Sequence, residues 1–135
     1  MTIQKATFFT LAVVTVHLVA VVIGLYWIWQ WFDVPMHFAG GFAVGMLGLS
    51  IWQRGVVGLK AEKQLQWWLA PMFIVGFVSF IGIGWEIYEF FMDSFFNAQI
   101  NAVYQFVRQP SIGDTIFDLV FDIFGGAAAI LIIRR

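Results

Sequence analysis

Four long apolar runs constrain this chain more than any other feature of its sequence. They cover residues 6–31, 34–53, 67–92 and 113–133. A helix rises by about 1.5 Å per residue, so each run is long enough to cross a hydrocarbon core of about 30 Å. The first run also exceeds the apolar core of about 7–15 residues that a signal peptide carries. The pattern therefore predicts four transmembrane helices in a single domain.

The composition agrees with a membrane protein. Of the 135 residues, 61% are hydrophobic and 11% are charged, whereas a soluble domain has roughly 25% charged residues. The net charge of -1 offers no basic face for nucleic acid. The absence of cysteine excludes disulfides, thiolate metal sites and a cysteine nucleophile. We therefore expect an all-α polytopic membrane protein that folds as a four-helix transmembrane bundle.

The segment 93–112, between the third and fourth runs, is more polar. Phe96, Ile100, Val103 and Val107 recur in it at spacings of four, three and four residues. This pattern is typical of an amphipathic helix, and the segment is too polar to span. We predict a short helix that lies at the membrane interface.

The basic residues predict the orientation of the bundle. Four spans place both termini and the loop between the second and third spans on one side. That side carries six of the seven basic residues, and the other side carries only Arg108. Because basic residues are enriched in cytoplasmic loops, both termini are expected to be cytoplasmic.

Acidic residues gather at the opposite, outer end of the bundle. Seven of the eight fall there, together with His37. Residues three or four positions apart share one face of a helix, and this spacing forms three stripes: His37, Gly41, Gly45 and Gly48; Ser79, Gly82, Glu86, Glu89 and Asp93; Asp114, Asp118, Asp122 and Gly126. Small residues allow membrane helices to approach closely, so we expect the acids to face the interior of the bundle.

A carboxylate within a span costs about 2.5–3.5 kcal/mol on insertion scales and suggests a functional site. Either some of these acids are protonated or a bound cation neutralises them. A histidine among carboxylates suits Zn, Mn, Fe, Mg or Ca. The candidate ligands of such a divalent cation are His37, Glu86, Asp118 and Asp122.

Two interpretations of function stay open at this point. The first is a metal-dependent enzyme acting on a lipid or lipid-linked head group, with Glu89 or Asp114 as general base and Arg108 holding a phosphate. The second is a non-catalytic structural or accessory subunit, whose acids stabilise the bundle or bind a partner. Helix capping is an alternative role for Asp114 and for Asp33. The expected partners are membrane lipids, a second copy of the chain or another membrane subunit.

Three motifs carry a family resemblance. They are Asp33-Val-Pro-Met-His37-Phe-Ala-Gly-Gly41, Trp85-Glu86-Ile-Tyr-Glu89-Phe90 and Asp114-Thr-Ile-Phe-Asp118-Leu-Val-Phe-Asp122-Ile-Phe-Gly-Gly126. In this order they resemble the YjdF-like proteins, which implies a multi-pass protein of the bacterial inner membrane. The arrangement is also distantly similar to VanZ-like proteins, although Glu86-x-x-Glu89 stands where those have Glu-x-x-Gln. Neither resemblance implies a settled activity.

Overall fold

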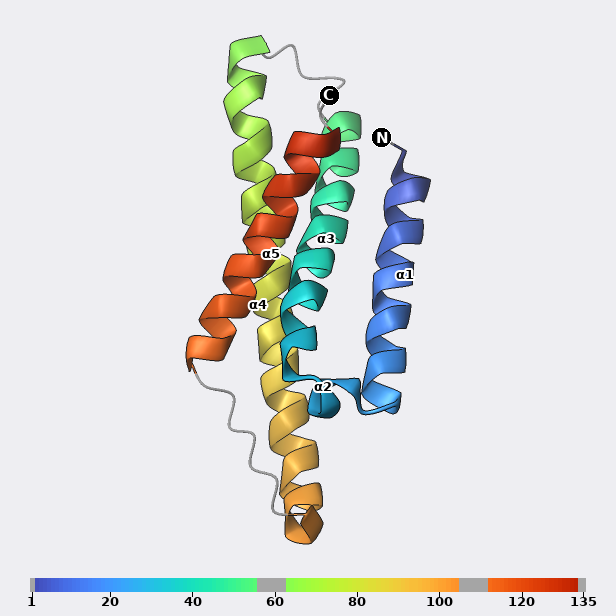
Figure 1. The fold of residues 1–135 in the computed structure, drawn as a ribbon. Coiled ribbons are helices and arrows are strands. Elements are labelled where there is room, and N and C mark those ends of the chain that lie inside the picture. The colour runs from blue at the N-terminus through green and yellow to red at the C-terminus, as the bar shows by residue number, and fades with distance from the viewer. Residues whose placement is uncertain (1, 56–62, 105–111, 134–135) are drawn as a thin grey trace.

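The chain is a bundle of long helices, seen in a computed structural model that describes residues 2–55, 63–104 and 112–133 (Figure 1). The elements in chain order are α1 (Ile3–Val22), α2 (Leu25–Ile28), the 3-10 helix η1 (Gln30–Phe32), α3 (Asp33–Gly55), α4 (Lys63–Tyr104) and α5 (Ile112–Ile133). Among these, α1, α3, α4 and α5 are long and apolar enough to cross a membrane. A helix satisfies its own backbone polar groups, as the membrane interior requires. The predicted all-α four-helix bundle is confirmed.

The first transmembrane helix ends earlier than the sequence predicted. We expected one span over residues 6–31, but α1 stops at Val22 and the chain turns at Ile23 and Gly24. Gly24 has a φ of 72°, a left-handed conformation that glycine adopts without steric cost. The apolar residues after it form α2 and η1, which lead directly into α3. Hydropathy alone did not separate this connection from the span, since both are equally apolar.

The predicted interfacial helix at residues 93–112 is not a separate element. Residues 93–104 are helical, but they continue α4 without a break. No glycine or proline interrupts the sequence between Met92 and Tyr104, so the helical hydrogen bonding of the span carries on. The lower part of α4 extends past the ends of α3 and α5 (Figure 1). Residues 105–111 lie outside the described residues.

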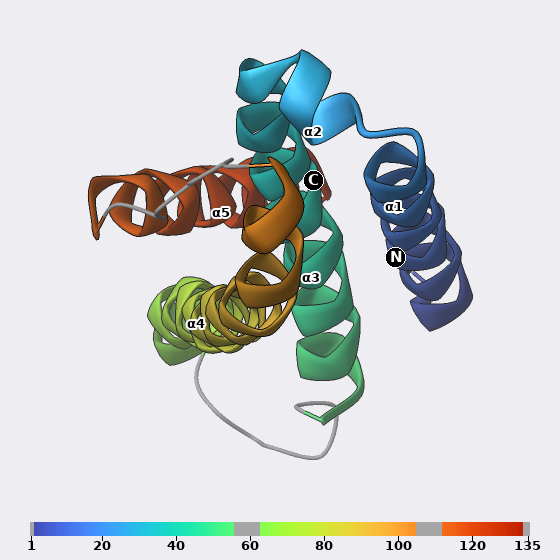
Figure 2. The ribbon, with the colours of Figure 1, turned by 90° about the horizontal axis from the view of Figure 1, so that it is seen from below.

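Helix α3 is the central element of the bundle. It packs against α1 on one side and against α4 and α5 on the other, while α4 and α5 also pack together (Figure 2). The buried core joins Met46 and Leu49 of α3 to Ile74 and Val78 of α4 and to Ala129 of α5. In the described part of the chain, the main contacts of α1 are with α3 and the short α2. The first helix is therefore the least enclosed of the four.

Glycines bring α3 and α5 into backbone contact. A Cβ atom added to Gly41 would overlap the backbone carbonyl of Asp122, and one added to Gly125 would overlap the backbone carbonyl of Phe38. At Gly45 the added Cβ would lie 2.9 Å from the Cα of Gly126. The two helices therefore have no space for a side chain along this line.

This packing makes a stability prediction. Gly125→Ala should destabilise the fold by about 1–3 kcal/mol or more, because the new methyl group forces α5 away from α3. Gly84→Ala is the matched control, since nothing lies within 4 Å of a Cβ at Gly84. Thermal unfolding in detergent should give a clearly lower midpoint for G125A and an unchanged or higher one for G84A. Equal midpoints for the two variants would contradict the close approach.

Candidate functional site

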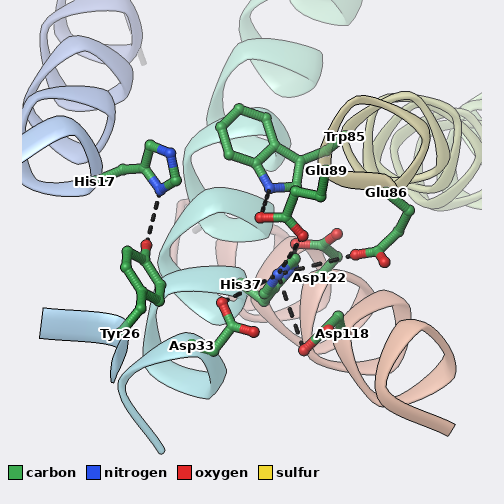
Figure 3. Close-up of polar contacts among 9 residues, drawn as sticks. All are labelled: His17, Tyr26, Asp33, His37, Trp85, Glu86, Glu89, Asp118 and Asp122. Carbon is green, nitrogen blue, oxygen red and sulfur yellow. Dashed lines mark hydrogen bonds and ion pairs between the residues drawn. The ribbon is translucent and has the colours of Figure 1, made fainter. Parts of the chain in front are cut away.

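A cluster of one histidine and five carboxylates joins three helices near the end of the bundle that carries α2 (Figure 3). Helix α3 supplies two members one turn apart, and α4 and α5 supply two each. The members are Asp33 and His37 from α3, Glu86 and Glu89 from α4, and Asp118 and Asp122 from α5. The acid-bearing faces that the helical spacing predicted therefore meet around one imidazole ring.

The two ring nitrogens of His37 face different acids. Around Nε2, the nearest carboxylate oxygens lie at 3.6 Å (Asp33), 3.9 Å (Glu86), 3.9 Å (Asp118) and 4.0 Å (Glu89). Nδ1 instead faces the Oδ1 atom of Asp122 at 3.5 Å. A direct N–H···O hydrogen bond is about 2.7–3.2 Å long. The four acids on the Nε2 side thus surround that nitrogen at more than hydrogen-bonding distance.

The centre of the cluster is shielded from solvent. The side chains of His37, Asp118 and Asp122 are 4%, 6% and 8% exposed, and that of Glu86 is 11% exposed. The Oε1 atom of Glu86 is buried without a hydrogen-bond partner among the described residues. A buried polar atom that lacks a hydrogen-bond partner costs free energy, and in the described part of the chain the nearest cationic group to this atom is the Nε2 atom of His37 at 3.9 Å.

Glycines make room for Asp122. Its backbone lies against Gly41 of α3, and a Cβ atom added to Gly82 of α4 would come within 2.6 Å of its Oδ2 atom. The side chain therefore occupies space that any larger residue at position 82 would fill. Gly82 and Gly41 belong to the small-residue stripes seen in the sequence, and their placement explains how a carboxylate fits between three helices.

Three rings border the cluster on the side of α1, those of Trp85, His17 and Tyr26. Trp85 donates a hydrogen bond from Nε1 to the Oε1 atom of Glu89 at 2.8 Å. The ring of His17 packs edge-on against Trp85, with centroids 4.9 Å apart, and its Nδ1 lies 2.7 Å from the hydroxyl of Tyr26 (Figure 3). His17 is therefore a packed histidine beside the cluster.

Several combinations of these groups have the spacing of a metal site. Three sets have ligand atoms that all lie within 4.8 Å of one another: Asp33, His37 and Glu89; His37, Glu86 and Asp118; Asp33, Asp114 and Asp118. Asp114, a candidate general base, therefore lies close to Asp118. Arg108, the candidate phosphate-binding residue, lies outside the described residues.

Asp33 is the member of the cluster that sequence reasoning did not select. We expected Asp33 to cap a helix, because it precedes Val34 and Pro35. The available signal was its spacing, since Asp33 and His37 are four residues apart and share one face of α3. Within a single helix, this spacing does not distinguish a helix cap from a member of a site.

The three motifs of this site lie within a single family match. A model of the family described as predicted membrane proteins, DUF2238, matches residues 3–135. The chain belongs to that family. No match was found among curated proteins or among solved structures. The family description and the four apolar helices together establish a multi-pass membrane protein.

In this DUF2238 protein, Tyr26 lies outside the transmembrane helices. Its environment predicts how the stability of the fold depends on pH. Burial, followed by the negative charges of Asp33 and Glu89, raises the pKa of Tyr26. Below about pH 10, the ordinary pKa of tyrosine, the phenol is neutral in the folded and the unfolded state, and its contacts contribute fully to the stability of the fold. As the pH rises further, the unfolded state loses its proton first, so stability is lost.

The unfolding midpoint of the wild type should therefore fall above pH 10 more steeply than that of Tyr26→Phe. Tyr88→Phe serves as a control for removal of a phenol hydroxyl from an exposed position, because Tyr88 is 46% exposed. The readout is the slope of the unfolding midpoint against pH. Loss of the contact with His17 shifts the midpoint of Y26F at every pH and so does not alter that slope. Parallel curves for all three proteins would refute the prediction.

Proposed function

We propose that this protein holds a divalent cation between His37, Glu86 and Asp118. The spacing around Nε2 of His37 supports the proposal. Ligands that lie about 2.0–2.2 Å from one metal ion are separated from each other by roughly 3–4 Å. The oxygens of Glu86 and Asp118 both lie 3.9 Å from Nε2, too far for a direct bond and within that range.

The unpartnered oxygen of Glu86 supports the same assignment. A cation at the centre of the set would give this buried atom the partner that it lacks among the described residues. It would also offset the repulsion between carboxylates brought together in a poor dielectric. Imidazole together with carboxylates favours Zn, Mn or Fe, whereas Mg and Ca prefer oxygen ligands alone.

Asp122 takes a different role from the one the sequence suggested. We expected it to be a ligand, but it faces Nδ1 of His37, the nitrogen away from the proposed metal. Histidine ligands commonly donate their second N–H to a carboxylate, which fixes the orientation of the ring. We therefore assign Asp122 the positioning of His37.

The proposed location is the outer half of the inner membrane. The chain starts and finishes at the end of the bundle where α3 finishes and α4 begins, opposite the cluster (Figure 1). The sequence assigns most basic residues to the end that carries the termini, which supports cytoplasmic termini. The resemblance to YjdF-like proteins supports a location in the bacterial inner membrane. The family match is compatible with that resemblance.

A metal ion in this position would supply an activated water for attack on a lipid or lipid-linked head group. Glu89 lies on the same side of His37 and is fixed by Trp85, so it is the residue we propose to accept the proton. Asp114 is the second candidate, since it lies close to Asp118. Arg108 retains its predicted role in holding a phosphate.

A second candidate function follows from the position of the cluster. The acids link α3, α4 and α5 beside the backbone contact at Gly41, so the same network could serve only to lock the bundle or to bind a partner subunit. In that case Glu86→Gln would preserve function. Loss of function in a folded E86Q variant would exclude this alternative.

Metal content tests the proposed function. Purified protein loaded separately with Zn, Mn, Fe, Mg and Ca should retain about one equivalent of a divalent ion by elemental analysis. Glu86→Gln and Asp118→Asn should each lose it, and Asp122→Asn should weaken it by about 10–100-fold. Glu62→Gln is the control, because the sequence places Glu62 in the loop on the opposite side. Absence of retained metal under every loading condition would overturn the proposal.

A further inference from the structure

A cavity of about 230 Å³ lies beside the cluster, between α1, α3 and α4. Its wall contains Asp33, Glu89 and Asp122, but neither Glu86 nor Asp118. The proposed metal ligands from α4 and α5 therefore do not line this space, although Asp33 and Glu89 face the same ring nitrogen of His37 as they do. The cavity and the proposed metal site meet at His37, which belongs to both.

The cavity has one polar and one apolar end. His17, Tyr26 and Trp85 line it near the cluster, and Val44 and Val78 line it further into the bundle. On α1 the lining extends back from His17 to Thr10, about 10 Å at 1.5 Å per residue. A ligand that fills this space must itself be polar at one end and apolar along its length.

The cavity lies where a membrane lipid can reach it. In the described part of the chain, α1 packs on α3 and α2 and forms no extended interface with α4 (Figure 2). Val14 of α1 and Ile81 of α4 line the cavity, and each is 39% exposed. Both helices are long and apolar enough to span a membrane, so in a bilayer the opening between them would face hydrocarbon.

The polar end selects for positive charge. Its lining includes three carboxylates and no lysine or arginine among the described residues, so the carboxylates outnumber the one cationic group that a protonated His37 would supply. Glu89 is fixed by its hydrogen bond from Trp85, and carboxylates form strong hydrogen bonds with an ammonium group. The rings of Trp85 and Tyr26 also line the cavity, and aromatic faces attract ammonium cations.

We propose that this cavity binds a membrane lipid whose head group carries an ammonium, with that group between Glu89, Asp33 and Trp85 and an apolar chain along Val14 and Ile81. The inference deepens the proposed function by naming the substrate class. It rests on that function only in assigning the metal to His37, Glu86 and Asp118.

Lipid retention tests the proposal. The full chain is reconstituted with equal amounts of phosphatidylethanolamine and phosphatidylglycerol of identical acyl chains, extracted in mild detergent, and analysed for bound lipid by mass spectrometry. The wild type should retain phosphatidylethanolamine with about tenfold preference. Val14→Phe should abolish retention by filling the cavity, and Glu89→Gln should abolish the preference. Val16→Phe is the matched control, because Val16 is 50% exposed on α1 and does not line the cavity.

The outcomes separate this proposal from the metal site. Metal content, measured on the same samples, should be unchanged in V14F, whereas E86Q should lose metal and still retain phosphatidylethanolamine. If V14F does not fold, Ile81→Trp fills the cavity from the opposite wall. Equal retention of both lipids, no retained lipid, or equal effects of V14F and V16F would overturn the inference. A wild-type dimer that V14F converts to monomer would overturn it too, by identifying a second copy as the occupant.

Discussion

The backbone contact between α3 and α5 is the constraint on which the rest of the structure depends. It exists because Gly41 and Gly125 carry no side chain where the two helices meet. In a membrane, apolar side chains gain little free energy by leaving lipid. Close packing of small residues therefore contributes much of the attraction between helices. The same contact places Asp122 and Asp118 beside His37. The glycines therefore decide both the stability of the bundle and the position of its polar centre.

The polar centre carries a cost that the packing alone does not offset. Five carboxylates surround one imidazole, and the atoms around Nε2 lie too far apart for direct hydrogen bonds. A network that served only to join helices would gain most from short, fully satisfied contacts. The observed spacing, with the Oε1 atom of Glu86 lacking a hydrogen-bond partner among the described residues, is the basis of the proposed cation site. The cavity between α1, α3 and α4 is lined by the same histidine.

Much of the fold and part of the site could be predicted from the chain alone. Hydropathy identified four spans, and the spacing of Asp114, Asp118 and Asp122 placed them on one face of a helix. Hydropathy did not reveal where the first span ends, because Gly24 sets that point through its backbone conformation. It also did not show that α4 continues to Tyr104, since the amphipathic pattern of that segment is also compatible with a separate helix.

The sequence by itself determined which residues share a face, because the helical repeat is a local property of the backbone. Only the tertiary structure decided which faces meet and at what height. Those choices depend on where glycines allow two backbones to touch, which involves residues far apart in the chain. Asp33 joined the cluster, Asp122 moved to the Nδ1 side of His37, and His17 came to lie against Trp85 for this reason. A helical repeat specifies directions around one axis, whereas a site requires the relative positions of several.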